Sequence, residues 1–92
     1  MALGKKRLNH ELILLARDYR NLTQNQLSKV LGIKQGTLSK IENGVLPVYE
    51  ESCLASEISI KLNFPIKFFL QDIKYNRNLD IIPYSKKLTI KY

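Results

Sequence analysis

The side chains best suited to recognise another molecule lie between residues 34 and 43. On a helix with 100° per residue, the inward stripe of this segment has only two apolar side chains, Leu38 and Ile41. The opposite face carries Gly36, Ser39, Lys40 and Asn43, with Gln35 at one flank. Amides and hydroxyls both donate and accept hydrogen bonds, so this face can read a polar edge. It lacks the Glu/Lys pairs that usually decorate a merely solvated helix.

Chemistry that breaks covalent bonds has little support in the sequence. His10 is the single histidine and Cys53 the single cysteine, so neither a multi-histidine metal site nor a disulfide scaffold is expected. The sequence has no Ser/His/Asp set, no phosphate-binding glycine loop and no convincing pair of carboxylates. We therefore expect a protein that is not an enzyme, has no metal or cofactor, and exposes His10 to solvent.

Length and hydropathy narrow the class of protein further. Ninety-two residues make one small domain, and a hydrophobic content of 45% is enough to build its core. No apolar run approaches the ~18–20 residues of a membrane helix, and no long apolar segment follows the charged start of the chain. These features predict a cytoplasmic protein without a membrane partner.

The charge of the chain favours a polyanionic partner. Fifteen Lys and Arg against eight Asp and Glu give a formal net charge of +7. The excess positive charge lies in residues 1–48 and 73–92, whereas residues 49–72 carry more acidic than basic residues. A basic surface of this kind is typical of nucleic-acid binding.

Five helices are expected to position the polar face. They span residues 9–20, 24–31, 34–43, 49–62 and a short stretch that opens at Pro65. Asn9 is a good N-cap, Thr23 and Gln26 form a capping box, and Gly32 suits the left-handed residue that ends a helix. The side chains expected to point inward from the first two helices are Leu8, Leu12, Ile13, Leu15, Ala16, Tyr19, Leu27, Val30 and Leu31.

Two other regions are less regular. Cys53 and Ile60 fall opposite the core stripe of the fourth predicted helix, and Leu14 lies outside that of the first. Either the C-terminal segment or a second subunit covers these side chains, or they are simply exposed. Residues 79–82 and 88–92 are rich in β-forming residues, which predicts a β-strand or a hairpin in the C-terminal extension.

The order of the motifs resembles a known family. Leu22-Thr23-Gln24, Leu27, Leu31-Gly32-Ile33 and the run from Gln35 to Gly44 are similar to the Xre/Cro family of helix-turn-helix regulators, which includes the lambdoid phage repressors. The resemblance covers about residues 9–70. It implies an all-α fold, a five-helix lambda-repressor-like helix-turn-helix domain over residues 9–70. A basic N-terminal arm at residues 1–8 would precede it, and a C-terminal extension at 71–92 would follow.

The resemblance also implies roles for individual residues. The positions that would read base edges in the major groove are Lys34, Gln35, Gly36, Thr37, Ser39 and Lys40. Gly36 has no side chain with which to read a base, but the absence of a side chain leaves room for the DNA to approach the helix closely. Gln24 and Asn43 correspond to residues that hold DNA phosphates. Arg17 and Glu42 each lie at the margin of an apolar face, and the family commonly pairs these positions, so we expect a partly buried salt bridge.

The function implied is a sequence-specific double-stranded DNA-binding transcriptional regulator, associated with the nucleoid. We expect a repressor that binds an inverted repeat as a homodimer, because one helix-turn-helix unit reads only a few base pairs. An alternative is an antitoxin-like protein that binds a protein partner through residues 73–92 and autoregulates through DNA binding. Non-specific coating of the nucleoid is a third possibility. Residues 64–69 and the start of the first helix also resemble helix-turn-helix domains fused to ImmA-type metallopeptidases, whose peptidase this chain lacks.

Overall fold

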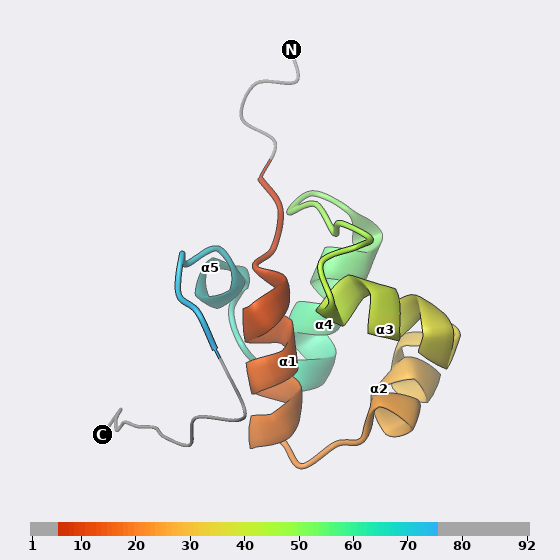
Figure 1. The fold of residues 1–92 in the computed structure, drawn as a ribbon. Helices are drawn as coiled ribbons and strands as arrows, with labels where there is room; N and C mark the ends of the chain where they lie inside the picture. Colours follow the sequence, from red (N-terminus) through yellow and green to blue (C-terminus); the bar gives the residue numbers. More distant parts are fainter. Residues whose placement is uncertain (1–5, 76–92) are drawn as a thin grey trace.

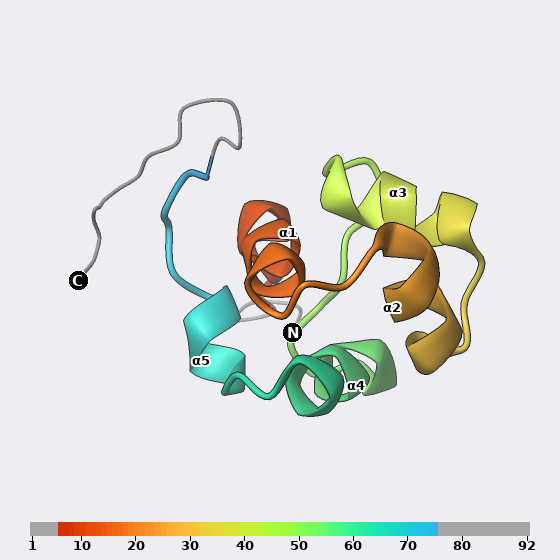
Figure 2. The same cartoon turned by 90° about the horizontal axis from the view of Figure 1, so that it is seen from below.

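A computed structural model describes residues 6–75 as a bundle of five helices (Figure 1). The helices are α1 (His10–Tyr19), α2 (Gln24–Leu31), α3 (Gln35–Glu42), α4 (Cys53–Leu62) and α5 (Ile66–Phe69). In Figure 2, α1 lies between α5 on one side and α2 and α3 on the other, with α4 below it. The predicted all-α fold with five helices is therefore confirmed.

Local signals in the sequence set the ends of the first two helices. The Asn9 side chain accepts a hydrogen bond from the Glu11 N–H and begins α1. Thr23 and Gln26 form the complete capping box that begins α2. Gly32 ends α2 with a φ of 74°, a left-handed conformation that costs glycine little. These three predictions are confirmed.

The fourth helix begins later than the sequence predicts. The prediction placed its start near Tyr49, whereas α4 begins at Cys53. Tyr49 instead forms an antiparallel bridge with Arg7, and the Glu50 N–H donates to the Lys6 carbonyl. This pairing holds Tyr49 in extended backbone, so the helix begins only after Ser52, which caps it by accepting from the Ala55 N–H. The helix ends at Leu62 as predicted, and Asn63 caps it in the left-handed conformation.

The hydrophobic core lies where α1 meets the other helices. Its fully buried side chains are Leu12, Ile13, Ala16, Leu27, Leu38, Ile41, Ala55, Ile58, Leu62 and Phe69. Of the side chains predicted to point inward from the first two helices, two are largely exposed. Val30 is 48% exposed because α2 packs on α3 and α4 through the side of the helix that carries Leu27. Tyr19 is 68% exposed, although its ring forms a T-shaped pair with Phe64 and lies under the Arg20 guanidinium.

The apolar residues expected to lie outside the core do so. Cys53 is exposed and Ile60 is 67% exposed, whereas Leu14 is half-buried. Within residues 6–75, no element covers Cys53 or Ile60. The idea that the C-terminal segment or a second subunit packs on them stays a prediction.

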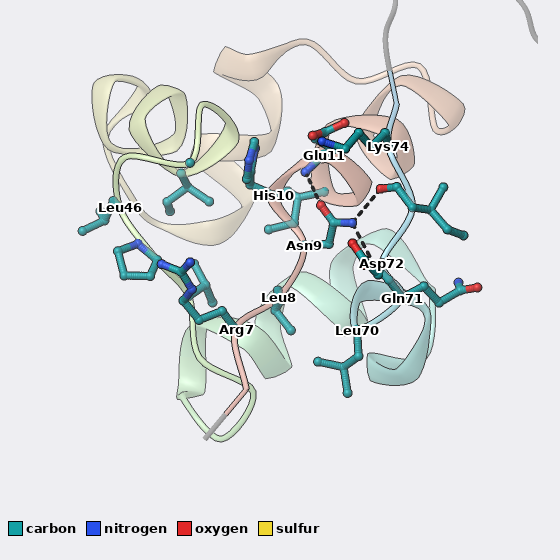
Figure 3. Close-up of a pocket in the computed structure, with 16 residues that line it drawn as sticks. Arg7, Leu8, Asn9, His10, Glu11, Leu46, Leu70, Gln71, Asp72 and Lys74 are labelled. Atoms are coloured by element: carbon teal, nitrogen blue, oxygen red, sulfur yellow. Dashed lines mark hydrogen bonds between the residues drawn. The ribbon is translucent and has the colours of Figure 1, made fainter. Parts of the chain in front are cut away.

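The segment after α5 returns along α1. The Asn9 amide donates to the carbonyl oxygens of Gln71 and Ile73, at 2.8 and 2.7 Å (Figure 3). The Tyr75 N–H donates to Glu11 and the Tyr75 hydroxyl donates to Asp18, so residues 71–75 are fixed to α1 at both ends. The β-strands predicted at 79–82 and 88–92 lie outside the described residues.

Candidate nucleic-acid interface

Helices α2 and α3 form two short helices joined by a tight turn. Gly32 ends α2, and α3 begins three residues later at Gln35. The Ile33 N–H donates to the Ser28 carbonyl, which fixes the turn to the body of α2. Leu38 and Ile41 are fully buried, so they hold α3 against the core while its opposite side faces outward. This arrangement is that of a helix-turn-helix.

The predicted reading residues share the outward side of α3 and the turn before it. Lys34 is the N-cap of α3, and α3 contains the other five. The exposed positions are Lys34, Gln35, Gly36 and Lys40, whereas Thr37 and Ser39 are half-buried. All six therefore have some solvent-accessible surface on one helix, which a major groove about 12 Å wide can admit.

A buried ion pair joins α3 to α1. Arg17 Nε donates to Glu42 Oε2 at 2.6 Å, and Arg17 Nη2 donates to Glu42 Oε1 at 2.9 Å. Both residues are buried, with 5% and 6% of their surfaces exposed. Arg17 Nη1 also donates to the Leu22 carbonyl in the segment between α1 and α2. The salt bridge expected between these two residues is present, and its bidentate geometry fixes the rotation of α3 about its axis.

Gln24 links this ion pair to the outward face of α3. Gln24 Nε2 donates to Glu42 Oε1 at 2.9 Å, and Gln24 Oε1 accepts from Gln35 Nε2 at 3.5 Å. The Gln24 side chain is half-buried and lies in the first turn of α2. A chain of polar contacts therefore runs from Arg17 through Glu42 and Gln24 to Gln35. The helical wheel could not predict it, because its members lie on three different helices.

His10 is a residue whose role the sequence prediction missed. It was expected to be exposed to solvent, but it is half-buried, and its Nδ1 lies 2.8 Å from the Glu42 carbonyl oxygen. A carbonyl oxygen only accepts hydrogen bonds, so Nδ1 is the donor. His10 therefore satisfies one of the free carbonyl groups at the C-terminal end of α3 and ties that end to α1.

The other predicted phosphate ligand follows the last turn of α3. Asn43 is exposed, and its Nδ2 lies 3.5 Å from the Ser39 hydroxyl. After Gly44, the N–H groups of Val45 and Leu46 both donate to the Lys40 carbonyl, which folds the loop back onto the helix end. Gln24 and Asn43 thus lie at the beginning of α2 and at the end of α3, on either side of the reading residues.

In Figure 3, a cleft of about 370 Å³ lies between the loop that follows α3 and the segment that follows α5. Within residues 6–75, no three His, Cys, Asp or Glu side chains lie close enough to hold a metal ion. In the same part of the chain, no helix is long and apolar enough to cross a membrane.

The fold and this face define a helix-turn-helix DNA-binding domain. Residues 13–47, from the middle of α1 to the loop after α3, match a protein-family model described as Helix-turn-helix. This match supports the resemblance seen in the sequence to Xre-type, lambda-repressor-like helix-turn-helix domains, which occur in DNA-binding regulators. No curated protein matches the chain.

Proposed function

We propose that the protein is a sequence-specific regulator that inserts α3 into the major groove of double-stranded DNA. The observation that carries this proposal is the chain of polar contacts that connects Gln35 to the buried ion pair. Its amide is exposed, yet it is connected through Gln24 and Glu42 to a buried arginine. A solvated surface glutamine has no need of such support, whereas a base-reading residue gains from a defined orientation because less conformational entropy is lost on binding.

Gln35 has the hydrogen-bonding capacity that adenine recognition requires. One N–H of its amide contacts Gln24, and no other hydrogen bond within residues 6–75 uses this side chain. The oxygen and the second N–H remain for the adenine amino group and N7. Lys40 donates to guanine, the Thr37 methyl group meets a thymine methyl group, and Lys34 and Ser39 complete the reading surface.

Gln24 and Asn43 hold DNA phosphates on either side of α3. The Gln24 amide uses one N–H for Glu42, which leaves its second N–H for a phosphate oxygen. Asn43 is exposed at the other end of α3. Contacts to phosphates orient the protein on the duplex, whereas contacts to base edges supply the sequence preference.

The protein acts as a homodimer on an inverted repeat, and the regulator is a repressor. One α3 helix spans only a few base pairs, so two copies related by a two-fold axis are needed for a useful specificity. The antitoxin-like alternative requires a partner surface in residues 73–92. Residues 73–75, the part of this segment that is described, contact α1 of their own chain, which favours the simple regulator.

The test is selection of bound sequences from a random duplex pool at about 150 mM salt, where non-specific phosphate binding is weakened. We expect an enriched palindrome whose half-sites lie about 10–10.5 base pairs apart, or a multiple of that spacing. Gln35→Ala should change the preferred base at one position of each half-site. Gln71→Ala, the same change on an exposed glutamine outside the helix-turn-helix, should leave the selected sequence unchanged. Binding without any enriched sequence would contradict the proposal.

A further inference from the structure

Gly36 is a glycine that the fold does not require. Of the three glycines in residues 6–75, Gly32 and Gly44 have φ values of 74° and 79°, which favour glycine over other residues. Gly36 lies in α3 without a positive φ, and a Cβ built on it meets no atom within 4 Å. Alanine fits this position and has the higher helix propensity. The stability of the domain therefore gives no reason for glycine here.

The position of Gly36 suggests what the missing side chain permits. It is exposed on the reading face of α3, next to Gln35 and one helical turn before Lys40. The Gln35 amide contacts Gln24 on α2. Between these longer side chains, position 36 presents only backbone, and the place of its Cβ is open space. A group of the DNA can therefore come closer to the axis of α3 at Gly36 than at Gln35 or Lys40.

Resting on the proposed DNA-binding function, we propose that Gly36 determines specificity by accepting the 5-methyl group of a thymine. The major groove offers donors and acceptors on every base pair, but the thymine methyl group is its one apolar projection. The surface of a glycine has no side-chain donor or acceptor to offer a polar base edge. It does offer apolar contact and space, and a Cβ at position 36 would occupy the place of the methyl group.

The proposal predicts that stability and binding respond in opposite directions to Gly36→Ala. The melting temperature of this variant is expected to equal that of the wild type or to exceed it by a few degrees, because alanine favours the helix. Its affinity for the selected operator is expected to fall at least tenfold. Ser56→Ala, on the exposed side of α4, is the matched control and should leave the affinity unchanged.

Uracil identifies the methyl group directly, because it differs from thymine only by lacking it. Operators with a single thymine-to-uracil exchange are bound to the wild type and to Gly36→Ala. At one position in each half-site, the exchange should weaken binding of the wild type and restore most of the affinity lost by Gly36→Ala. Two results would overturn this inference and leave the proposed function intact. Either Gly36→Ala binds the operator within twofold of the wild-type affinity, or no single thymine-to-uracil exchange restores the affinity that Gly36→Ala has lost. A wild type that selects no sequence overturns the proposed function and this inference with it.

Discussion

The His10 ring lies in the space that a side chain on Gly44 would need. A Cβ built on Gly44 would be 2.8 Å from His10 Nε2 and 2.9 Å from His10 Cδ2. Gly44 also has a φ of 79°, in the left-handed region. The histidine packs against the loop at the end of α3 while its Nδ1 donates to the Glu42 carbonyl. Both contacts fix the end of α3 to α1.

Gly44→Ala is therefore expected to destabilise the domain by about 1–3 kcal/mol, because it adds backbone strain and displaces His10. Urea denaturation followed by circular dichroism measures the change in the free energy of unfolding. Gly36→Ala is the matched control, since the same methyl group is added where φ is ordinary and the space is open. Equal stabilities of the two variants would contradict the role given to Gly44.

Glu42→Ala is expected to cost about 3–5 kcal/mol of stability, because it leaves the Arg17 guanidinium buried without its carboxylate. A small domain tolerates little loss of this size, so the variant should be partly unfolded at 25 °C. The double variant Arg17→Met/Glu42→Leu removes both charges and should recover much of the loss. A Glu42→Ala protein with the wild-type melting temperature would show that the ion pair does not stabilise the fold.

If Gln24 holds a phosphate as proposed, Gln24→Ala is expected to weaken binding to every DNA sequence and to reduce the salt dependence of binding. It should also weaken the base preference that we propose for Gln35, because the Gln35 amide then loses its contact with α2. A double-mutant cycle with Gln35→Ala, measured on the operator, tests this connection. We expect a coupling energy of at least about 0.5 kcal/mol. Strictly additive effects would mean that Gln24 does not orient Gln35.

Asn9 performs two tasks that a pair of variants can separate. Its Oδ1 caps α1, and its Nδ2 donates to the carbonyl oxygens of residues 71 and 73. Asn9→Asp keeps an acceptor for the cap but loses both donors, whereas Asn9→Ala loses everything. We expect hydrogen exchange at the Tyr75 amide to accelerate in both variants. Only Asn9→Ala should also lose the cap, which contributes about 1 kcal/mol of stability. An unchanged Tyr75 amide would show that Asn9 does not hold this segment.

The sequence by itself determined the local structure of this protein. Asn9, Thr23 and Gly32 act through hydrogen bonds and backbone preferences within a few residues, so the ends of α1 and α2 could be read directly. The apolar stripe of α3 likewise identified which of its sides faces outward. The start of α4 could not be read in this way, because it depends on the pairing of Tyr49 with Arg7, far away in the chain.

Tertiary structure alone decided which surfaces are covered and which side chains meet. Periodicity places Tyr19 and Val30 on apolar faces, but a face is buried only where another helix packs on it, and no helix among residues 6–75 packs over these two. The contacts of His10 and Gln24 with Glu42 join residues 32 and 18 positions apart. Contacts of this kind depend on how three helices are oriented in space, and no local pattern in the sequence encodes that orientation.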